Sequence, residues 1–480
     1  MKVLRQSVHG TLRQRLLLAT VSAFALGSSG AWAQEEDEEI EEITVTGSQI
    51  RGAAINEALP VSVMDAEDIE ILGVDSGADL LEFMAEQGQN FFSESENISG
   101  GVNSARGDVG AYNLRNLGTG NTLVLLNGRR LVNNASYQTE EVGGSFVPVN
   151  TVNSQSLPVF GLERVEVLRD GASAIYGADA VAGVVNYVLK DDFDGLTIDA
   201  RLSAYDHMPR DDYTLTLEWG NDFNDGATNL SVFGTVDGQG TYRYNLNENR
   251  DLYSDLDRLN LYLYLNHEFS NGIQSFTEMT YYMANTNTIR HASTGLSAVA
   301  DLRVAADNYY NPFGPVGSPN RLPDSVIGAG TIPDEGVELI MDNYRWAQVP
   351  RIVDNDGKTY RFLQGFRGLW GEWDWETAVT WSKAEKEDIT HNRISNTLMQ
   401  AALNDTTASA FNPFSGRVNS NIEQALIDVR RDNETELKMI DFKISNPAVF
   451  ELPAGPVAVL AGAEFRSESF INDRDPRLDG

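Results

Sequence analysis

The residue types that most often carry enzyme chemistry are scattered along this chain. No Ser-His-Asp spacing, H-E-x-x-H motif or metal-ligand cluster appears around its five histidines, which are His9, His207, His267, His291 and His391. The absence of cysteine excludes disulfides and thiolate metal sites. Gly118-Thr119-Gly120 is glycine-rich, but it lacks the full G-x-G-x-x-G pattern and a following helix that would bind phosphate. We therefore predict a protein that is not an enzyme and holds no cofactor or metal.

The length and net charge of the chain further narrow the class of protein to which it can belong. With 480 residues the chain is too long for one ordinary compact domain. Its formal net charge of −34 opposes binding to nucleic acid, because phosphate recognition needs clustered lysine and arginine. The same charge suits a solvated extracellular surface.

The N-terminal sequence predicts export. Residues 1–33 combine a basic start, an apolar core at Leu16–Leu26 and an A-x-A cleavage site that ends at Ala33. Residues 34–42 are acidic and are expected to be disordered. A short β-prone segment follows, made of Ile43, Thr44, Val45, Thr46 and Gly47. A lone strand of this kind can add to the edge of a partner's sheet. No later run is long and apolar enough for a membrane helix, so a membrane protein with this sequence must be a barrel.

Several turn and cap signals place elements within residues 56–190. Asp65 and Ser76 are expected to cap short helices, to about Ile71 and over Gly77–Gln87 respectively. Asn127-Gly128 lies between two apolar runs and predicts a type I′ hairpin. The stretch Gly161–Lys190 reads as a strand, a turn at Asp170-Gly171, a segment rich in small residues, and a second strand from Val184. Alone, that stretch would also fit a β-turn-β corner of a small α/β domain.

The sequence pattern changes after residue 190 to long strands with alternating apolar and polar residues. About nine strands are predicted, near 195–206, 211–223, 227–240, 256–270, 272–287, 357–370, 372–386, 433–446 and 456–471. The expected connections are short at 221–226, 270–272, 371 and 447–456, and long near 288–355 and 387–432. Such alternation is typical of an outer-membrane barrel with an apolar outer face and a polar lumen, although a soluble β-sandwich gives similar strands.

Four stretches of the chain carry a resemblance to the TonB-dependent outer-membrane receptors. ERVEVLRDGASAIYGADAVAGVVN, Glu163–Asn186, resembles the C-terminal half of the plug domain of that family. YNLRNLG and TLVLLNGRRLV resemble two further plug signatures, except that Asn116 stands where the family often has glycine. Residues 43–47 resemble the TonB box. The plug-signature residues carried over are Arg115, Asn127, Gly128, Arg129, Glu163, Arg164, Arg169, Gly171, Tyr176, Gly177, Gly183 and Asn186.

The resemblance implies an α+β plug domain followed by an antiparallel transmembrane β-barrel. The expected division is a signal peptide at 1–33, an acidic linker with the TonB box at 34–55, the plug at 56–190 and the first part of the barrel at 191–480. Plugged transporters have about 22 strands, so about nine strands predict a fragment. In the family, plug arginines and acidic barrel residues form ionic contacts that hold the plug, but the sequence does not assign partners to Arg115, Glu163, Arg164 or Arg169.

The function that the resemblance implies is energised import across the Gram-negative outer membrane. The expected partners are the TonB complex of the inner membrane, outer-membrane lipid and a small-molecule substrate, with the receptor monomeric. A receptor that mainly signals is the alternative, although the short stretch between Ala33 and Ile43 leaves no room for the extra domain of signalling members. The substrate stays open among a ferric siderophore, a carbohydrate, a cobalamin-like cofactor and a peptide. Aromatic residues of the first long loop could contact a substrate or order the loop; they are Tyr309, Tyr310, Phe313, Tyr344 and Trp346.

Overall fold

The computed structural model describes residues 61–74, 76–88, 106–169, 172–204, 211–240, 251, 253–290, 302–341, 344, 346, 349–415, 420–453 and 455–478. The predicted signal peptide, the segment from Ile43 to Gly47 and Gly171 lie outside these residues. Within them, no helix has both the length and the apolar character needed to cross a membrane.

The first elements follow the predicted caps. Strand β1 (Val61–Asp65) leads into helix α2 (Ala66–Leu72), and the Asp65 side chain accepts a hydrogen bond from the Asp68 N–H. Ser76 caps α3 (Gly77–Phe83) in the same way. This second helix is shorter than predicted, because Met84 is extended and Gln87 forms a β-bridge with Leu114.

A five-stranded sheet forms the centre of this region, which we call the plug. Its order is β1-β6-β7-β2-β3, and only the β2–β7 pair is parallel. The further strands are β2 (Thr122–Leu126), β3 (Arg129–Arg130), β6 (Leu162–Leu168) and β7 (Gly183–Leu189). Gly183 has a φ of +137°, and a Cβ there would lie 2.6 Å from the Leu168 carbonyl oxygen, so a close backbone approach requires glycine.

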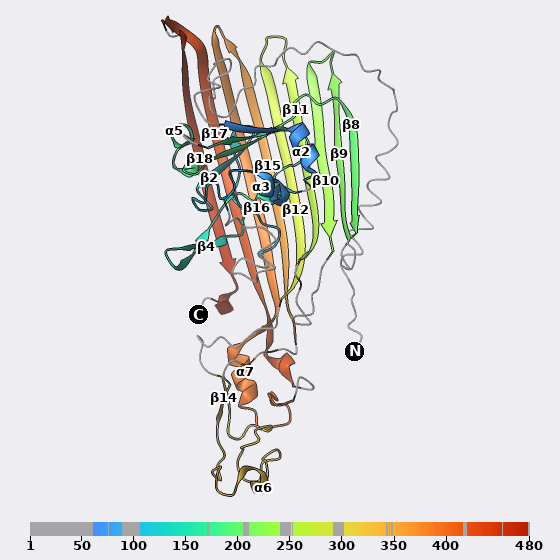
Figure 1. Ribbon diagram of the computed structural model, residues 1–480, viewed down its shortest axis with the longest axis vertical. Helices are drawn as coiled ribbons and strands as arrows, with labels where there is room; N and C mark the ends of the chain where they lie inside the picture. The colour runs from blue at the N-terminus through green and yellow to red at the C-terminus, as the bar shows by residue number, and fades with distance from the viewer. Residues whose placement is uncertain are drawn as a thin grey trace. The chain divides into compact units, whose positions relative to one another are not determined.

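Short elements complete the plug. Helix α5 (Ala172–Tyr176) and the 3-10 turn η2 (Ala178–Ala180) occupy the segment rich in small residues between β6 and β7. A separate hairpin, β4 (Gln138–Val142) and β5 (Ser145–Val149), precedes the 3-10 turn η1 (Ser154–Ser156). The apolar core of the plug extends to two residues of the large sheet, Phe233 and Tyr262. The plug therefore packs directly against one face of that sheet (Figure 1).

The large sheet has nine antiparallel strands in the order β18-β17-β16-β15-β12-β11-β10-β9-β8. Their bounds are β8 (Gly195–Ala204), β9 (Asp211–Phe223), β10 (Thr228–Gln239), β11 (Asp255–Glu268), β12 (Gln274–Arg290), β15 (Arg351–Trp370), β16 (Trp373–Ile394), β17 (Leu426–Leu452) and β18 (Gly455–Arg474). The strand prediction is confirmed, and several strands are longer than predicted. The 3-10 turn η4 (Pro476–Leu478) follows β18.

Alternation along the strands separates two faces. On β11, Tyr262 and Tyr264 are buried on the plug side, whereas Leu261, the residue before Tyr262, is exposed on the opposite face. Apolar side chains on the outer face include Phe362 and Val379. This pattern matches an apolar exterior and a polar lumen.

The connections alternate between short and long. Those at 224–227, 269–273, 371–372 and 453–454 are short, and those at 205–210, 240–254, 291–350 and 395–425 are longer. The ten-residue turn predicted at 447–456 is wrong, because β17 continues to Leu452. A bulge between Asn446 and Phe450 accommodates Pro447, which has no N–H to donate to the ladder.

The two longest connections share one small folded module. It contains β13 (Leu302–Val304), α6 (Asp324–Ile327), β14 (Leu339–Met341), α7 (Asn396–Leu403) and η3 (Ile422–Ala425). Trp346 is buried there and stacks near Phe411, with ring centroids 5.3 Å apart. Figure 1 shows α6, α7 and β14 gathered beyond one end of the strands. For Trp346, ordering of the loop is therefore the observed role.

Candidate functional site

The tip of the β2–β3 hairpin lies against the inner face of the large sheet. Asn127 and Gly128 both have positive φ, 48° and 75°, as a type I′ turn requires. The Asn127 side chain accepts a hydrogen bond from the Leu189 N–H at 2.9 Å and donates one to Glu278 of β12 at 2.8 Å. The Gly128 N–H donates to Asn186 at 2.8 Å. Three plug-signature residues thus meet at one turn, and the turn contacts the sheet.

Arg129 is the main charged contact of this hairpin with the sheet. Its guanidinium lies 2.5 Å from a Glu376 carboxylate oxygen of β16 and 3.1 Å from one of Asp441 of β17. All three side chains are largely buried. Burial alone would lower the pKa of Arg129, but the two carboxylates outweigh it and hold the pKa above its ordinary value. Arg129 therefore stays charged and binds two neighbouring strands at once.

A second buried pair lies beside this contact. Glu278 accepts the bond from Asn127 and lies 3.5 Å from Arg361 of β15, and both of these charged side chains are almost fully buried. Arg361 also donates to the Arg130 carbonyl of the hairpin at 2.7 Å. We call the contacts of residues 127–130 with β12, β15, β16 and β17 the hairpin anchor.

Further ion pairs border the hairpin anchor. Lys190 lies 3.2 Å from Glu218, which also accepts a bond from the Gly161 N–H at 2.8 Å. Arg130 pairs with Asp179 at 2.8 Å and Glu464 at 3.4 Å. These cations each have a carboxylate partner.

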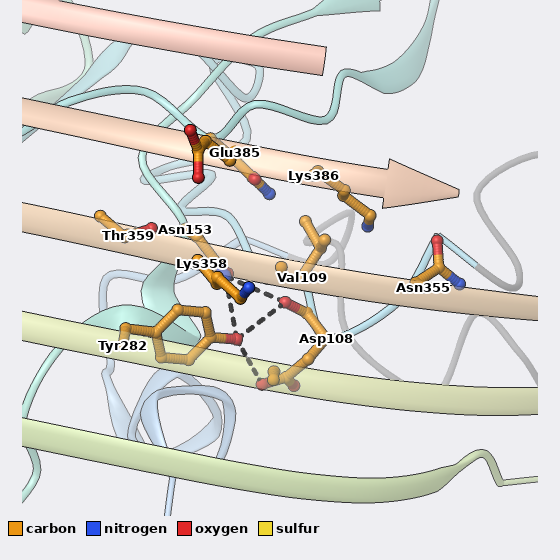
Figure 2. A pocket seen from close by; sticks show the side chains of 12 residues that line it. Asp108, Val109, Asn153, Tyr282, Asn355, Lys358, Thr359, Glu385 and Lys386 are labelled. Carbon is orange, nitrogen blue, oxygen red and sulfur yellow. Dashed lines mark hydrogen bonds between the residues drawn. The ribbon is translucent and has the colours of Figure 1, made fainter. Parts of the chain in front are cut away.

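A separate anchor ties the plug segment around Asp108 to β11 and β12. The Asp108 carboxylate accepts two bonds of 2.6 Å from Arg258, which also donates to Asp237 at 2.9 Å. The Tyr282 hydroxyl donates to Asp108 at 2.6 Å, and Asn153 donates to the Asp108 carbonyl at 2.9 Å. Figure 2 shows Asp108, Tyr282 and Asn153 of this network at a small cavity that Lys386 and Asn355 also line.

The other sequence-predicted arginines contact the plug itself. Arg115, in the left-handed region with a φ of 56°, donates to the Ala182 carbonyl at 3.0 Å. Arg164 pairs with its neighbour Glu163 and, at 2.7 Å, with the buried Glu166. Arg169 lies 3.7 Å from Glu86. Among the arginines that the resemblance singled out, Arg129 alone forms a described ion pair with the large sheet.

Two further signature positions, Tyr176 and Gly177, lie beside Arg130 of the hairpin. The Tyr176 carbonyl accepts a bond from Arg130 at 2.9 Å, and Gly177 follows with a φ of 86°. Asn116, at the position where the family often has glycine, also has positive φ, 58°, which asparagine tolerates better than most residues.

Sequence reasoning missed the partners of the anchors. They are Asp108, Glu218, Asp237, Arg258, Glu278, Arg361, Glu376 and Asp441. For all of them except Asp108, which lies in a plug segment, the available signal was a charge at an inward position of an alternating strand. Among the described residues, no group of three or more His, Asp or Glu side chains could hold a metal ion.

Comparisons with known proteins agree with this architecture. The family model of the TonB-dependent receptor plug domain matches residues 54–184. The iron-regulated outer membrane virulence protein of Vibrio cholerae is 25% identical over 168 residues, which cover 34% of this chain and 22% of that protein. The vitamin B12 transporter BtuB of Vibrio vulnificus is 27% identical over 173 residues, 36% of this chain and 24% of the transporter.

A solved structure extends the likeness beyond the plug. The siderophore receptor PirA of Acinetobacter baumannii superposes with a TM-score of 0.53 at 16% identity, over 88% of this chain and 50% of that receptor. The chain thus spans half of that structure, and the matched stretches span about a quarter of the curated relatives. Residues 54–184 are thus a plug domain of the TonB-dependent receptor family, and the nine-stranded antiparallel sheet beside them agrees with the architecture of that family.

Proposed function

We propose that this chain belongs to an energised transporter that imports a scarce small molecule, such as a ferric siderophore or a carbohydrate, across the Gram-negative outer membrane. The names of the proteins that this chain resembles, an iron-regulated outer membrane protein, a vitamin B12 transporter and a siderophore receptor, support import of a scarce nutrient. The proposed partners are the substrate, outer-membrane lipid and the TonB complex, and the proposed receptor is a monomer.

The hairpin anchor is the observation that carries this proposal. Its groups are charged and buried between the plug and the polar face of the sheet. A buried ion pair contributes little net stability compared with apolar packing, because its groups regain hydration when both become exposed. Removal of one partner alone, in contrast, leaves a costly unpaired charge. Such contacts fix a plug in one position and still allow it to separate when it is pulled into water.

The pull would act through the segment Ile43–Gly47. We propose that it adds as a strand to a sheet of TonB, which depends on main-chain hydrogen bonds. Proline at Val45 removes one N–H donor and fixes φ near about −65°, whereas alanine keeps the backbone unchanged.

The test uses the full-length gene and compares surface binding with uptake of the same labelled substrate. Val45→Pro is expected to abolish uptake and leave surface binding intact, while Val45→Ala has a mild effect. Full uptake by the proline variant would show that the segment is only a linker. Binding without uptake in the unmodified receptor would favour a receptor that mainly signals.

The assignment of the chain's parts belongs to the same proposal. Residues 1–33 are a signal peptide, 34–55 a linker with the TonB box, 56–190 the plug and 191–480 barrel. The mature protein in the outer membrane then begins at Gln34. N-terminal sequencing of exported protein that finds residues before Ala33 would contradict this assignment.

A further inference from the structure

Two arginines flank Tyr137 on the inner face of the sheet, and a lysine contacts the backbone of one of them. Arg106 comes from the plug, Lys386 from β16 and Arg431 from β17. The guanidinium carbons of Arg106 and Arg431 lie 4.7 and 5.3 Å from the centre of the Tyr137 ring. Arg431 donates to the Tyr137 hydroxyl at 3.1 Å, and Lys386 donates to the Arg106 carbonyl. We call Arg106, Lys386 and Arg431 the cation cluster.

The cation cluster differs from the other interface charges because no carboxylate among the described residues forms an ion pair with it. Five other cations at the interface each form an ion pair with an Asp or Glu; they are Arg129, Arg130, Lys190, Arg258 and Arg361. Within the described part of the chain, none of the three members of the cation cluster forms one. This is unusual in a protein with a net charge of −34.

The nearby acids do not neutralise the cation cluster. Asp108 is already bound by Arg258 through two bonds of 2.6 Å. Asp388 lies opposite Arg431 in the strand register, on the same inner face, but forms no described ion pair with it. Of these two described acids, only Asp388 remains to balance three positive charges.

Burial makes this excess of positive charge costly. Lys386 is only 7% exposed, and the Nε–H of Arg431 is buried without a protein acceptor among the described residues. A buried donor that lacks an acceptor costs roughly 1–3 kcal/mol. An oxyanion between these side chains would accept their hydrogen bonds and offset their mutual repulsion.

The position of the cation cluster fits a ligand that enters from the long-connection end of the sheet. Gly107 has a φ of +84°, and a Cβ there would lie 2.8 Å from the Lys386 Nζ, so glycine lets the plug segment approach β16 closely. Figure 2 shows Lys386 and Asn355 on neighbouring strands beside Asp108. Two further arginines, Arg351 and Arg393, lie at inward register positions nearer the strand ends.

We propose that the cation cluster binds an oxyanion of the substrate, a carboxylate or a phosphate, and that the transported molecule is therefore anionic. This inference rests on the proposed transport function and narrows its substrate class, because it sets aside neutral carbohydrates. Guanidinium groups suit the role, since their planar N–H forks bind carboxylate and phosphate oxygens in pairs.

The test uses the full-length receptor, purified in a nonionic detergent, and three probes in equilibrium dialysis: citrate, inorganic phosphate and maltohexaose. Citrate or phosphate is expected to bind, more weakly as sodium chloride is raised, and maltohexaose is not. Arg431→Gln is expected to weaken anion binding at least tenfold, and Arg106→Gln to weaken it similarly. Arg431→Lys, which keeps the charge, should retain part of the affinity.

Arg430→Gln is the matched control. Arg430 is the neighbouring residue on β17, but it lies on the outer face and pairs there with Glu387 and Asp432. The Arg430→Gln receptor should bind both anions as tightly as the unmodified receptor does. Preference for citrate over phosphate, or the reverse, would identify the oxyanion.

Two results would overturn the inference: equal anion binding by Arg431→Gln and Arg430→Gln, or binding of maltohexaose alone. Neither depends on uptake. If the receptor takes up a neutral substrate and Val45→Pro abolishes that uptake, the proposed transport function stands and the anionic substrate class is refuted. If Arg431→Gln loses anion binding while Val45→Pro keeps full uptake, the proposed anion site stands and transport driven through the TonB box is refuted.

Discussion

The hairpin anchor and the cation cluster both lie at the interface between the plug and the large sheet, but they differ in whether their cations are paired with carboxylates. At the hairpin anchor, Arg129 has two carboxylates within 3.1 Å. At the cation cluster, nearer the long connections, Arg106 and Arg431 approach a tyrosine ring, and neither forms a described ion pair with an acid. The difference indicates a division of work. Matched charges hold the plug on the sheet, and unmatched charges remain available to a ligand.

Removal of Arg129 is expected to have the largest effect, and to affect the hairpin anchor much more than the cation cluster. Arg129→Gln leaves Glu376 and Asp441 buried without their cation, and loss of one side of a buried ion pair costs about 3–5 kcal/mol. We expect β2 and β3 to lose hydrogen-exchange protection by that amount in the full-length receptor. Anion binding at the cation cluster should change much less.

Two variants control this experiment. Arg130→Gln removes the neighbouring arginine, whose partners Asp179 and Glu464 are partly exposed, and should cost no more than about 1 kcal/mol. Adding Glu376→Gln and Asp441→Asn to Arg129→Gln should restore much of the lost protection, because no unpaired charge then remains. Equal effects of Arg129→Gln and Arg130→Gln would argue against the hairpin anchor.

Substitution of Asn127 in the turn of the hairpin is expected to have a smaller effect on hydrogen-exchange protection. Asn127→Ala places an alanine at a φ of 48°, which costs roughly 1–2 kcal/mol, and also removes both side-chain hydrogen bonds. Asn127→Gly removes the same bonds without the backbone strain. Protection of β2 and β7 amides should therefore fall further in the alanine variant. If the glycine variant were the less protected one, backbone conformation would not be the reason for asparagine here.

The smallest expected effect concerns the pH dependence of the cation cluster. Burial raises the pKa of Tyr137, but the charges of Arg106 and Arg431 outweigh burial and bring the pKa below the usual tyrosine value of about 10. Ionised Tyr137 would neutralise part of the cation cluster, so anion affinity should fall as pH rises toward that value.

Tyr137→Phe isolates this contribution. The phenylalanine ring cannot ionise, whereas Lys386 and Asp388 are present in both proteins. The ratio of the two anion affinities, measured at each pH, should change by roughly two- to fivefold across the titration of Tyr137. A ratio that is constant with pH would show that Tyr137 stays neutral beside a bound anion.

Local features of the fold could be predicted from the sequence. The caps at Asp65 and Ser76, the turn at Asn127-Gly128 and the nine strands depend on neighbouring residues, and the structure confirms them. The end of α3 and the course of β17 depend on tertiary pairing. Gln87 ends the helical segment by bridging to Leu114, and the bulge at Pro447 is defined by its pairing with β18.

The partners of the candidate site could not be predicted, because alternation gives the face of a residue but not what lies across from it. Arg129 and Asp441 are separated by 312 residues, and their contact depends on how the hairpin sits on the sheet. The same limit hid the cation cluster, whose members come from three distant segments. Inward charges on alternating strands were visible, but their pairing was not.

The module shared by the two longest connections has a consequence for molecules that recognise this protein. Trp346 from one connection and Met399, Leu403 and Phe411 from the other bury one another, so neither connection keeps its shape alone. A peptide copied from either one would expose these apolar side chains and present a different surface. Antibodies raised against the intact module should therefore bind conformational epitopes and fail to bind the separate peptides.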